Sequence, residues 1–356
     1  MRGTTRRSTL ALLGASLLAR PGWAQGGAQG GAQGRTIVDS ANRTVTLPAR
    51  INRVFVAGPP ASVLMYVLAP DMMVGWVRLP SPAEKEFLAA PVHDLPETGR
   101  LTGRGDTLSL ERLVAAKPDL VVDFGSVTDT YKSLADRVQS QTGIPYVLID
   151  GSFAATPASV RLTANIIGRS ERGAAVADYA EKAFAVVDGV LARVPAARRP
   201  RVYLARGPEG LETGGRGSIN TEIIERVGAV NVAEGLGGRG NTANASLEQI
   251  IAWQPDAIVT LDRTFYQGVK SKPGWDQVRA VTQNKVYLAP NLPWGWIDAP
   301  PSLNRLIGLR WLLATFYPAE AGIDLRTDTR LFYALFYGVK LEDSQLDRLL
   351  GGASPR

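Results

Sequence analysis

The chain has 356 residues, of which 45% are hydrophobic and 21% charged, a balance that is ordinary for a globular protein. It contains no cysteine and a single histidine, His93. A disulfide, an iron–sulfur cluster, a thiolate zinc site and a lipid-modified N-terminal cysteine are therefore excluded, as is a transition-metal site of several imidazoles from one chain. The length suggests two domains, each large enough for its own core.

Residues 1–24 have the pattern of an export signal. Arg6 and Arg7 precede an apolar run over 10–19, which is about half as long as a membrane-spanning helix. Small residues stand three positions and one position before a cut after Ala24, as signal peptidases require. The arginine pair is typical of the twin-arginine route, which exports folded proteins.

The net positive charge of the chain comes largely from the signal and gives little indication of function. The signal holds four arginines and no acid, so a net charge of +7 for the whole chain becomes +3 for the remainder. That value, with no long Lys/Arg run, argues against a nucleic-acid partner. Residues 25–35 repeat Gly-Gly-Ala-Gln and are interpreted as a flexible linker. We expect a soluble, monomeric periplasmic protein that does not span a membrane and is not a lipoprotein.

A sixteen-residue pattern occurs twice in the chain. Residues 109–124 (SLERLVAAKPDLVVDF) and 246–261 (SLEQIIAWQPDAIVTL) are identical at seven positions. In each copy a serine can cap a helix, apolar residues follow at helical spacing, a proline ends the helix, and a β-branched run predicts a buried strand.

Two further pairs of segments keep the same order. Residues 53–57 match 201–205, and residues 142–150 resemble 282–290. Each half is thus predicted to run strand, helix, helix, strand, helix, strand, which gives a parallel sheet covered on both faces. The predicted α/β fold has one lobe at 36–156 and another at 197–356.

A long helical stretch over 157–196 separates the two halves. From Val176 to Val194 its apolar residues recur at i, i+3, i+4 and i+7. The part from 172 to 194 would be about 35 Å long. We interpret this stretch as a stiff bridging helix.

An exported chain with these duplicated segments and a helical bridge resembles the helical-backbone solute-binding proteins, and within them the iron-siderophore and vitamin B12 branch that serves ABC importers. The resemblance covers about 50–350, with the family's domain at about 50–325. It implies two Rossmann-like lobes joined by a rigid backbone helix, a ligand cleft between them, and a permease with its ATPase docked across both lobes. It implies a metal chelate as the transported ligand, no covalently bound cofactor and no catalysis.

Ligands of parallel sheets approach the carboxyl ends of the strands. Trp294 and Trp296 lie in the Pro/Gly-rich segment NLPWGWID, where an indole face could support a chelate ring. Arg100 and Arg104 lie in a glycine-rich loop and could bind anionic oxygens. The alternatives are lobe-to-lobe packing for the tryptophans and a solvated loop for the arginines. Other candidates in loops that follow predicted strands are Pro60, Ser126, Arg206, Tyr266 and Asp298.

His93 is interpreted as a surface-loop residue rather than a metal ligand. With Asp94, Asp123 or Tyr266 it could cap one position on a metal that a chelator carries, but it could not hold a naked ion. No metal site is therefore predicted within the protein.

Members of the family dock their permease through one acidic residue on each lobe. In the second lobe, Ser218–Glu225 matches that pattern, with Glu225 better aligned than Glu222. The corresponding stretch of the first lobe, 60–66, has no acid, so Glu84 or Glu86 would have to substitute.

Several ligands remain open within the binding interpretation. A ferric siderophore leads, followed by haem or cobalamin, a nickel chelate and molybdate, whereas zinc or manganese binding would need more histidines. A two-lobed enzyme such as a glycosyltransferase is a rival of another class, but no GxGxxG follows a predicted strand. A binding protein that signals or scavenges without a transporter is a third possibility.

Overall fold

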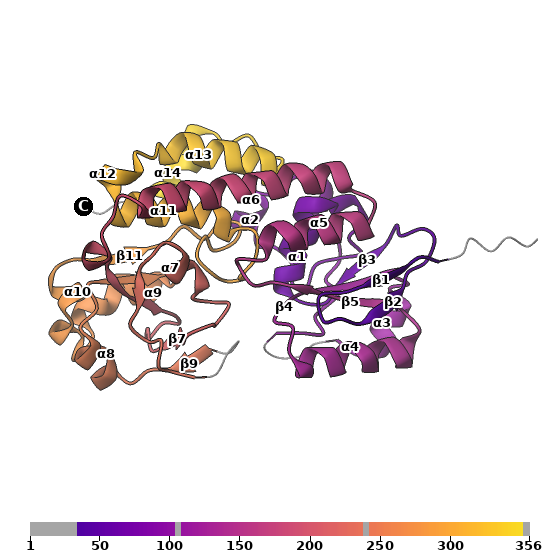
Figure 1. Ribbon diagram of the computed structural model, residues 1–356, viewed down its shortest axis with the longest axis horizontal. Helices are drawn as coiled ribbons and strands as arrows, with labels where there is room; N and C mark the ends of the chain where they lie inside the picture. The colour runs from indigo at the N-terminus through magenta and orange to yellow at the C-terminus, as the bar shows by residue number, and fades with distance from the viewer. Residues whose placement is uncertain (1–33, 104–107, 238–241, 352–356) are drawn as a thin grey trace, which may run out of the picture. The chain divides into compact units, whose positions relative to one another are not determined.

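The computed structural model describes residues 34–103, 108–237 and 242–351 (Figure 1). The predicted signal peptide and all but the last two residues of the linker lie outside this part of the chain, as does Arg104. Where the chain is described, no helix combines the length and the apolar character needed to cross a bilayer.

The first parallel sheet has the strand order β3-β4-β5. Its strands are β3 (Val54–Val56), β4 (Leu120–Gly125) and β5 (Tyr146–Asp150). Their side chains alternate between two core clusters, because Val54 and Val56 belong to one and Phe55 to another. The sheet is therefore covered on both faces, as predicted.

The second parallel sheet repeats this arrangement with one strand added. Its order is β11-β10-β6-β8. The strands are β6 (Arg201–Ala205), β8 (Val230–Asn231), β10 (Ala257–Thr260) and β11 (Val286–Leu288). Strands β6, β10 and β11 correspond in order to β3, β4 and β5, which confirms the predicted α/β fold with two lobes of parallel strands.

The duplicated helix starts as its sequence predicts. Ser109 accepts a hydrogen bond from the Arg112 amide at the start of α3 (Leu110–Ala115), and Ser246 accepts one from Gln249 at the start of α8 (Leu247–Trp253). Both helices end before a residue at positive φ, namely 45° at Lys117 and 44° at Gln254. The two copies thus share the same turn into the following strand.

The aspartate of each Pro-Asp pair ties this turn to the neighbouring strand. Asp119 Oδ2 accepts hydrogen bonds from the amides of Asn52 (2.7 Å) and Arg53 (2.9 Å), just before β3. Asp256 Oδ2 accepts one from the Arg201 amide (2.8 Å) at the start of β6. This contact explains why the Pro-Asp pair stands at the same place in both halves.

The predicted bridge consists of two helices rather than one. Helix α5 (Thr156–Ile166) ends before Gly168, whose φ is +70°, and α6 (Ser170–Leu191) follows. With 22 residues, α6 is about 33 Å long. Arg172 near its start donates to the carbonyl of Val67 in the first lobe, and Asp188 near its end pairs with Arg226 in the second. Of these two helices, α6 is therefore the one that contacts both lobes.

The last helical segments of the chain, over 333–350, return to the first lobe, although the sequence predicts that all of 197–356 belongs to the second. The Tyr66 hydroxyl donates to the carbonyl of Tyr337 at 2.6 Å, and Gln345 donates to the carbonyl of Glu86 at 3.0 Å. In Figure 1 these yellow helices lie beside α6. The helical segments from residue 305 onward are α11 (Arg305–Phe316), α12 (Pro318–Ala321), α13 (Leu325–Phe332), a π-helical turn (Tyr333–Tyr337) and α14 (Asp343–Leu350).

The remaining elements are short or flank the sheets. Two antiparallel pairs are β1 (Thr36–Val38) with β2 (Thr44–Thr46), and β7 (Glu212–Gly214) with β9 (Thr242–Asn244). The other α-helices are α1 (Pro59–Leu68), α2 (Pro82–Lys85), α4 (Asp129–Thr142), α7 (Glu222–Arg226), α9 (Arg263–Gly268) and α10 (Arg279–Thr282).

Candidate functional site

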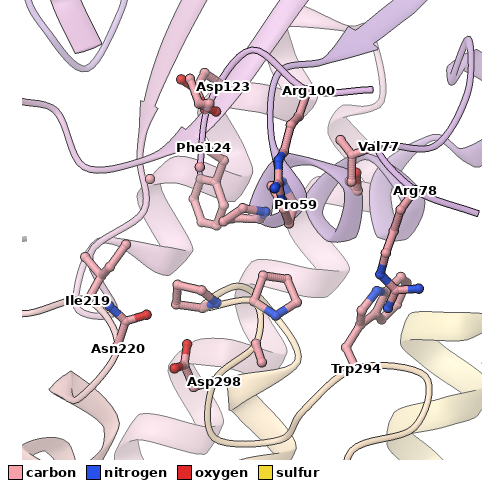
Figure 2. A pocket seen from close by; sticks show the side chains of 18 of the residues that line it. Pro59, Val77, Arg78, Arg100, Asp123, Phe124, Ile219, Asn220, Trp294 and Asp298 are labelled. Atoms are coloured by element: carbon pink, nitrogen blue, oxygen red, sulfur yellow. The ribbon is translucent and has the colours of Figure 1, made fainter. Parts of the chain in front are cut away.

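A cavity of about 610 Å³ lies where loops of both lobes meet. The first lobe contributes the end of β4, the start of α1 and the loops around Trp76 and Arg100. The second contributes Arg206, residues 219–220 and the segment 293–301. Figure 2 shows these side chains converging on one space. The cavity therefore occupies the place expected for a ligand of two parallel sheets.

Six of the predicted binding residues line this cavity. Four of them, Arg100, Arg206, Trp294 and Asp298, offer charged or aromatic groups. The other two are Pro60 and Ser126. The structure thus brings together residues that lie far apart in the sequence, although their role in binding remains a prediction.

The other predicted residues do not lie together in this way. Trp296 is 0% exposed and packs in the core, where its indole N–H donates to the Tyr333 hydroxyl at 3.2 Å. Tyr266 lies on α9, half-buried and outside the cavity lining. Only one indole of the NLPWGWID segment can therefore face a ligand in the cavity. Arg104 lies outside the described residues.

Contacts with the end of β3 hold the loop that carries Arg100. The amides of Leu101 and Thr102 both donate to the carbonyl of Ala57, at 2.8 and 3.0 Å. A Cβ at Gly58 would lie 2.4 Å from Thr102 Oγ1, so only glycine allows this close approach. Strand β3 and this glycine fix the loop over the cavity.

Asp123 is a buried carboxyl group at the end of β4 and lines the cavity. Burial raises its pKa to about 6, against hydrogen bonds to its carboxylate from the hydroxyls of Tyr146 (3.1 Å) and Thr102 (3.2 Å). Its charge is therefore sensitive to pH in a range where an aspartate with an ordinary pKa is fully ionised.

Arg206 and Asp298 form an ion pair in the opposite wall. Arg206 Nε lies 2.8 Å from Asp298 Oδ2, and a second nitrogen of Arg206 bonds Glu212. Asp298 is 0% exposed, and burial raises its pKa although the charge of Arg206 acts in the opposite direction. Two carboxylates thus orient one guanidinium at the cavity wall.

Aromatic rings from both lobes pack around Trp294. Its ring centroid lies 5.3 Å from that of Tyr66, 5.2 Å from Tyr337 and 6.4 Å from Trp76. The indole N–H of Trp76 donates to the carbonyl of Val92 at 2.9 Å, which fixes that ring. Trp76 and Trp294 both line the cavity, so they offer a rigid apolar surface to a ligand.

Sequence reasoning missed Trp76, Arg78 and Asn220, which also line the cavity. Trp76 forms only an isolated β-bridge with Glu97, and Asn220 follows the short strand β7 by several residues. The search for residues after predicted strands could not find them. A search for aromatic and arginine residues close together in Gly-rich or Pro-rich segments would have marked Trp76 and Arg78.

His93 lies away from the cavity lining. Its Nε2 is 2.9 Å from the carbonyl oxygen of Leu88, which can only accept a hydrogen bond, so this nitrogen carries the proton. Within the described ranges, no group of three or more His, Asp or Glu side chains is placed to hold a metal ion.

The two candidate docking acids differ in their surroundings. Glu222 accepts a hydrogen bond from the Phe153 amide (2.6 Å) and lies 3.7 Å from Arg305, so it joins the two lobes internally. Burial raises its pKa, against the charge of Arg305. Glu225 on the same helix is exposed. Of the first-lobe substitutes, Glu84 pairs with Arg78 and Glu86 with Arg348.

The sequence matches the periplasmic binding protein family over residues 85–292, more than half of the chain. The chain belongs to the periplasmic binding protein family. The resemblance drawn from the duplicated segments is confirmed.

Individual relatives agree with this assignment. The chain is 26% identical over 330 residues to the molybdate-binding protein MolA of Haemophilus influenzae, a match that covers 85% of this chain and 91% of MolA. A cobalamin-binding protein of Halobacterium salinarum is 27% identical over 233 residues, which is 62% of this chain and 57% of that protein. An ABC transporter solute-binding protein from Sulfurospirillum deleyianum superimposes with a TM-score of 0.80 at 28% identity, covering 89% of this chain and 99% of that one.

Proposed function

We propose that the protein captures a metal chelate, in the first place a ferric siderophore, and delivers it to the permease of an ABC importer. Membership of a family of solute-binding proteins supports the transport role. In this role the protein is a carrier and not an enzyme, and the chelate is its cargo rather than a resident cofactor.

The size and lining of the cavity carry this proposal. A volume of about 610 Å³ suits a molecule of several rings and far exceeds the needs of a bare ion. Trp76, Trp294 and Phe124 offer apolar faces, and guanidinium groups stand beside them. Among the described residues, no cluster of three or more His, Asp or Glu side chains could hold a bare metal ion, so in this proposal the metal arrives already coordinated.

Molybdate is the second candidate, and the similarity to MolA favours it. Arginines such as Arg100 and Arg206 could donate hydrogen bonds to an oxyanion. A small oxyanion would leave much of the cavity to water. The cobalamin-binding relative supports a bulkier alternative, and haem or a nickel chelate would occupy the same space.

We further propose a place and partner for this activity. The signal over 1–24 would direct the chain to the periplasm through the twin-arginine route. Glu225, exposed on α7, would meet a basic residue of the permease, whereas Glu222 is engaged between the lobes. The protein would act as a monomer.

Titration calorimetry with ferric siderophores, haem, cobalamin, a nickel chelate and molybdate tests the proposed ligand class. We expect at least one ferric chelate to bind with a dissociation constant of about 1 μM or lower, which corresponds to a binding free energy of about −8 kcal/mol. Binding should quench tryptophan fluorescence in the wild type and in Trp296→Phe, but less in Trp294→Phe, because Trp294 lines the cavity and Trp296 does not; the remaining quenching in Trp294→Phe would come from Trp76, which also lines the cavity. Tight binding of molybdate with no binding of any chelate would refute the proposal.

A further inference from the structure

Charged residues of both signs line the cavity in equal number. Among the described residues, the charged side chains of the lining are three arginines and three carboxyl groups. The arginines are Arg78, Arg100 and Arg206, and the carboxyl groups are those of Glu84, Asp123 and Asp298. A site built for a highly charged anion would instead show an excess of cationic groups.

Arg78 is paired with a carboxylate at the rim of the cavity. Its two terminal nitrogens lie 2.9 and 2.5 Å from the two carboxylate oxygens of Glu84, a bidentate arrangement. Glu84 also accepts a hydrogen bond from the Ser81 amide (2.7 Å) as part of the capping box of α2. The carboxylate is therefore held beside the guanidinium by the helix start as well as by its charge.

Arg206 is shared between two carboxylates. Asp298 lies 2.8 Å from its Nε, and Glu212 bonds another of its nitrogens. Asp298 has no exposed surface and cannot turn away into water. An anion that approached Arg206 would also approach these two negative charges.

The third carboxyl group lies in the first lobe. Asp123 is fixed by the hydroxyls of Thr102 and Tyr146, neither of which brings a positive charge. In Figure 2 it lies on the same side of the cavity as Arg100. It further reduces the attraction that Arg100 would exert on an anion.

We propose that the cavity selects a chelate of low net charge, neutral or singly charged, over a multiply charged anion. This inference rests on the proposed function and specifies its ligand. The neighbouring carboxylates offset the positive charge of the arginines, so an added negative charge on the ligand gains little attraction. Repulsion between the ligand and the buried carboxylates, in contrast, grows with each added negative charge. The carboxylates thus disfavour a multiply charged anion, while the aromatic and proline side chains attract a chelate of low net charge through apolar contact.

Two ferric complexes of similar size but different charge test this inference. Three hydroxamates balance the charge of ferric iron, whereas three catecholates leave the complex trianionic. Titration calorimetry on the purified protein should give a dissociation constant for a tris-hydroxamate at least about tenfold below that for a tris-catecholate. Added salt should leave the hydroxamate constant nearly unchanged, because no net charge is involved.

Two substitutions that remove opposing carboxylates should shift this preference. Glu84→Gln keeps a side chain able to complete the capping box, and Asp298→Asn keeps the size of a buried side chain. Each should improve catecholate binding relative to hydroxamate binding by about threefold or more. Asp178→Asn is the matched control, because Asp178 forms an exposed ion pair with Arg161 outside the cavity lining and the change in charge is the same.

The outcomes separate this inference from the function on which it rests. Stronger binding of the catecholate by the wild type would overturn the inference and leave chelate capture intact. A shift in Glu84→Gln and Asp298→Asn no larger than that in Asp178→Asn would also overturn it. If no ferric chelate of either charge binds, the proposed function fails and the inference with it. Because Glu84 lies at the rim, its variant is informative even if Asp298→Asn fails to fold.

Discussion

Strand β4 of the first half and strand β10 of the second hold the same position in their sheets, each paired with the two strands that correspond. Where the first half has Asp123, the second has Thr260. Asp123 lines the cavity, whereas Thr260 is fully buried and accepts a hydrogen bond from the Asp262 amide at 3.0 Å. The same strand therefore presents a carboxyl group to the cavity in one half and closes its own turn in the other.

This difference distinguishes the residues that build the fold from those that line the cavity. The helix caps and the Pro-Asp contacts are alike in both halves because each performs the same local task there. The first half lines the cavity with residues 123–126 at the end of β4. The second reaches it through Arg206 and through loops farther from β10, at 219–220 and 293–301. The two halves thus differ in the segments that line the cavity.

Among the substitutions considered, removal of the side chain that joins the two halves should lower the free energy of unfolding most. Arg305 is 0% exposed, and it donates to the carbonyl of Gly151 in the first half (3.0 Å) and of Ile219 in the second (2.7 Å). Arg305→Ala leaves these carbonyls unpaired and Glu222 without its opposite charge. We expect the free energy of unfolding in urea to fall by about 3–5 kcal/mol.

Arg161→Ala is the control for this variant. Arg161 pairs with Asp178 and Glu181 on the surface, where loss of an ion pair costs about 1 kcal/mol or less. If the two variants were equally stable, the halves would not depend on Arg305 for their junction.

Making Asp123 neutral, as Thr260 is, should remove a pH dependence of stability. Burial raises the pKa of Asp123 from 3.8 to about 6, so the folded protein binds more protons than the unfolded chain between these values. The free energy of unfolding therefore falls as pH rises through this window, and the cost is complete above pH 6. Asp123→Asn should be more stable than the wild type by about 3 kcal/mol at pH 7, with the difference shrinking as pH falls and nearly gone at about pH 3.

Urea denaturation at several pH values measures this difference. A gap between the two proteins that stays constant from pH 4 to pH 7 would contradict the raised pKa. Asp178→Asn is a suitable control, since its carboxylate is mostly exposed, pairs with the exposed Arg161 and lies outside the cavity lining.

The fold was accessible from the sequence because its determinants are local. Ser109 and Ser246 cap helices, and apolar runs form buried strands, through interactions within a few residues. The sequence indicates 172–194 as the part of 157–196 with bridging length, but it predicts the whole stretch as one bridge, because Gly168 alone does not reveal whether a helix bends or turns back. The return of α14 to Glu86 depends on tertiary contacts that leave no local pattern.

The candidate site was only partly accessible, and the two tryptophans of one loop show why. Trp294 and Trp296 are separated by one glycine, yet only Trp294 lines the cavity. Trp296 instead fills the core beside Tyr333, which lies some forty residues later in the chain. Which side of such a loop faces a ligand depends on helices that pack behind it, so no local pattern could distinguish the two indoles.

The smallest change in the free energy of unfolding is expected at the repeated Pro-Asp pair, where the two halves are most alike. Asp119→Ala removes the acceptor of two backbone amides, those of Asn52 and Arg53, and Asp256→Ala removes that of one, Arg201. We expect free energies of unfolding lower by about 2 and about 1 kcal/mol, since water replaces part of each lost bond at these half-exposed positions. Asp256 also pairs with Arg279 at 2.6 Å, an exposed contact that adds little. Equal losses of stability in the two variants would mean that the ion pair of Asp256 contributes as much as the second amide hydrogen bond of Asp119. A larger loss in Asp256→Ala would refute the view that accepting backbone amide hydrogen bonds is the shared role of the two aspartates.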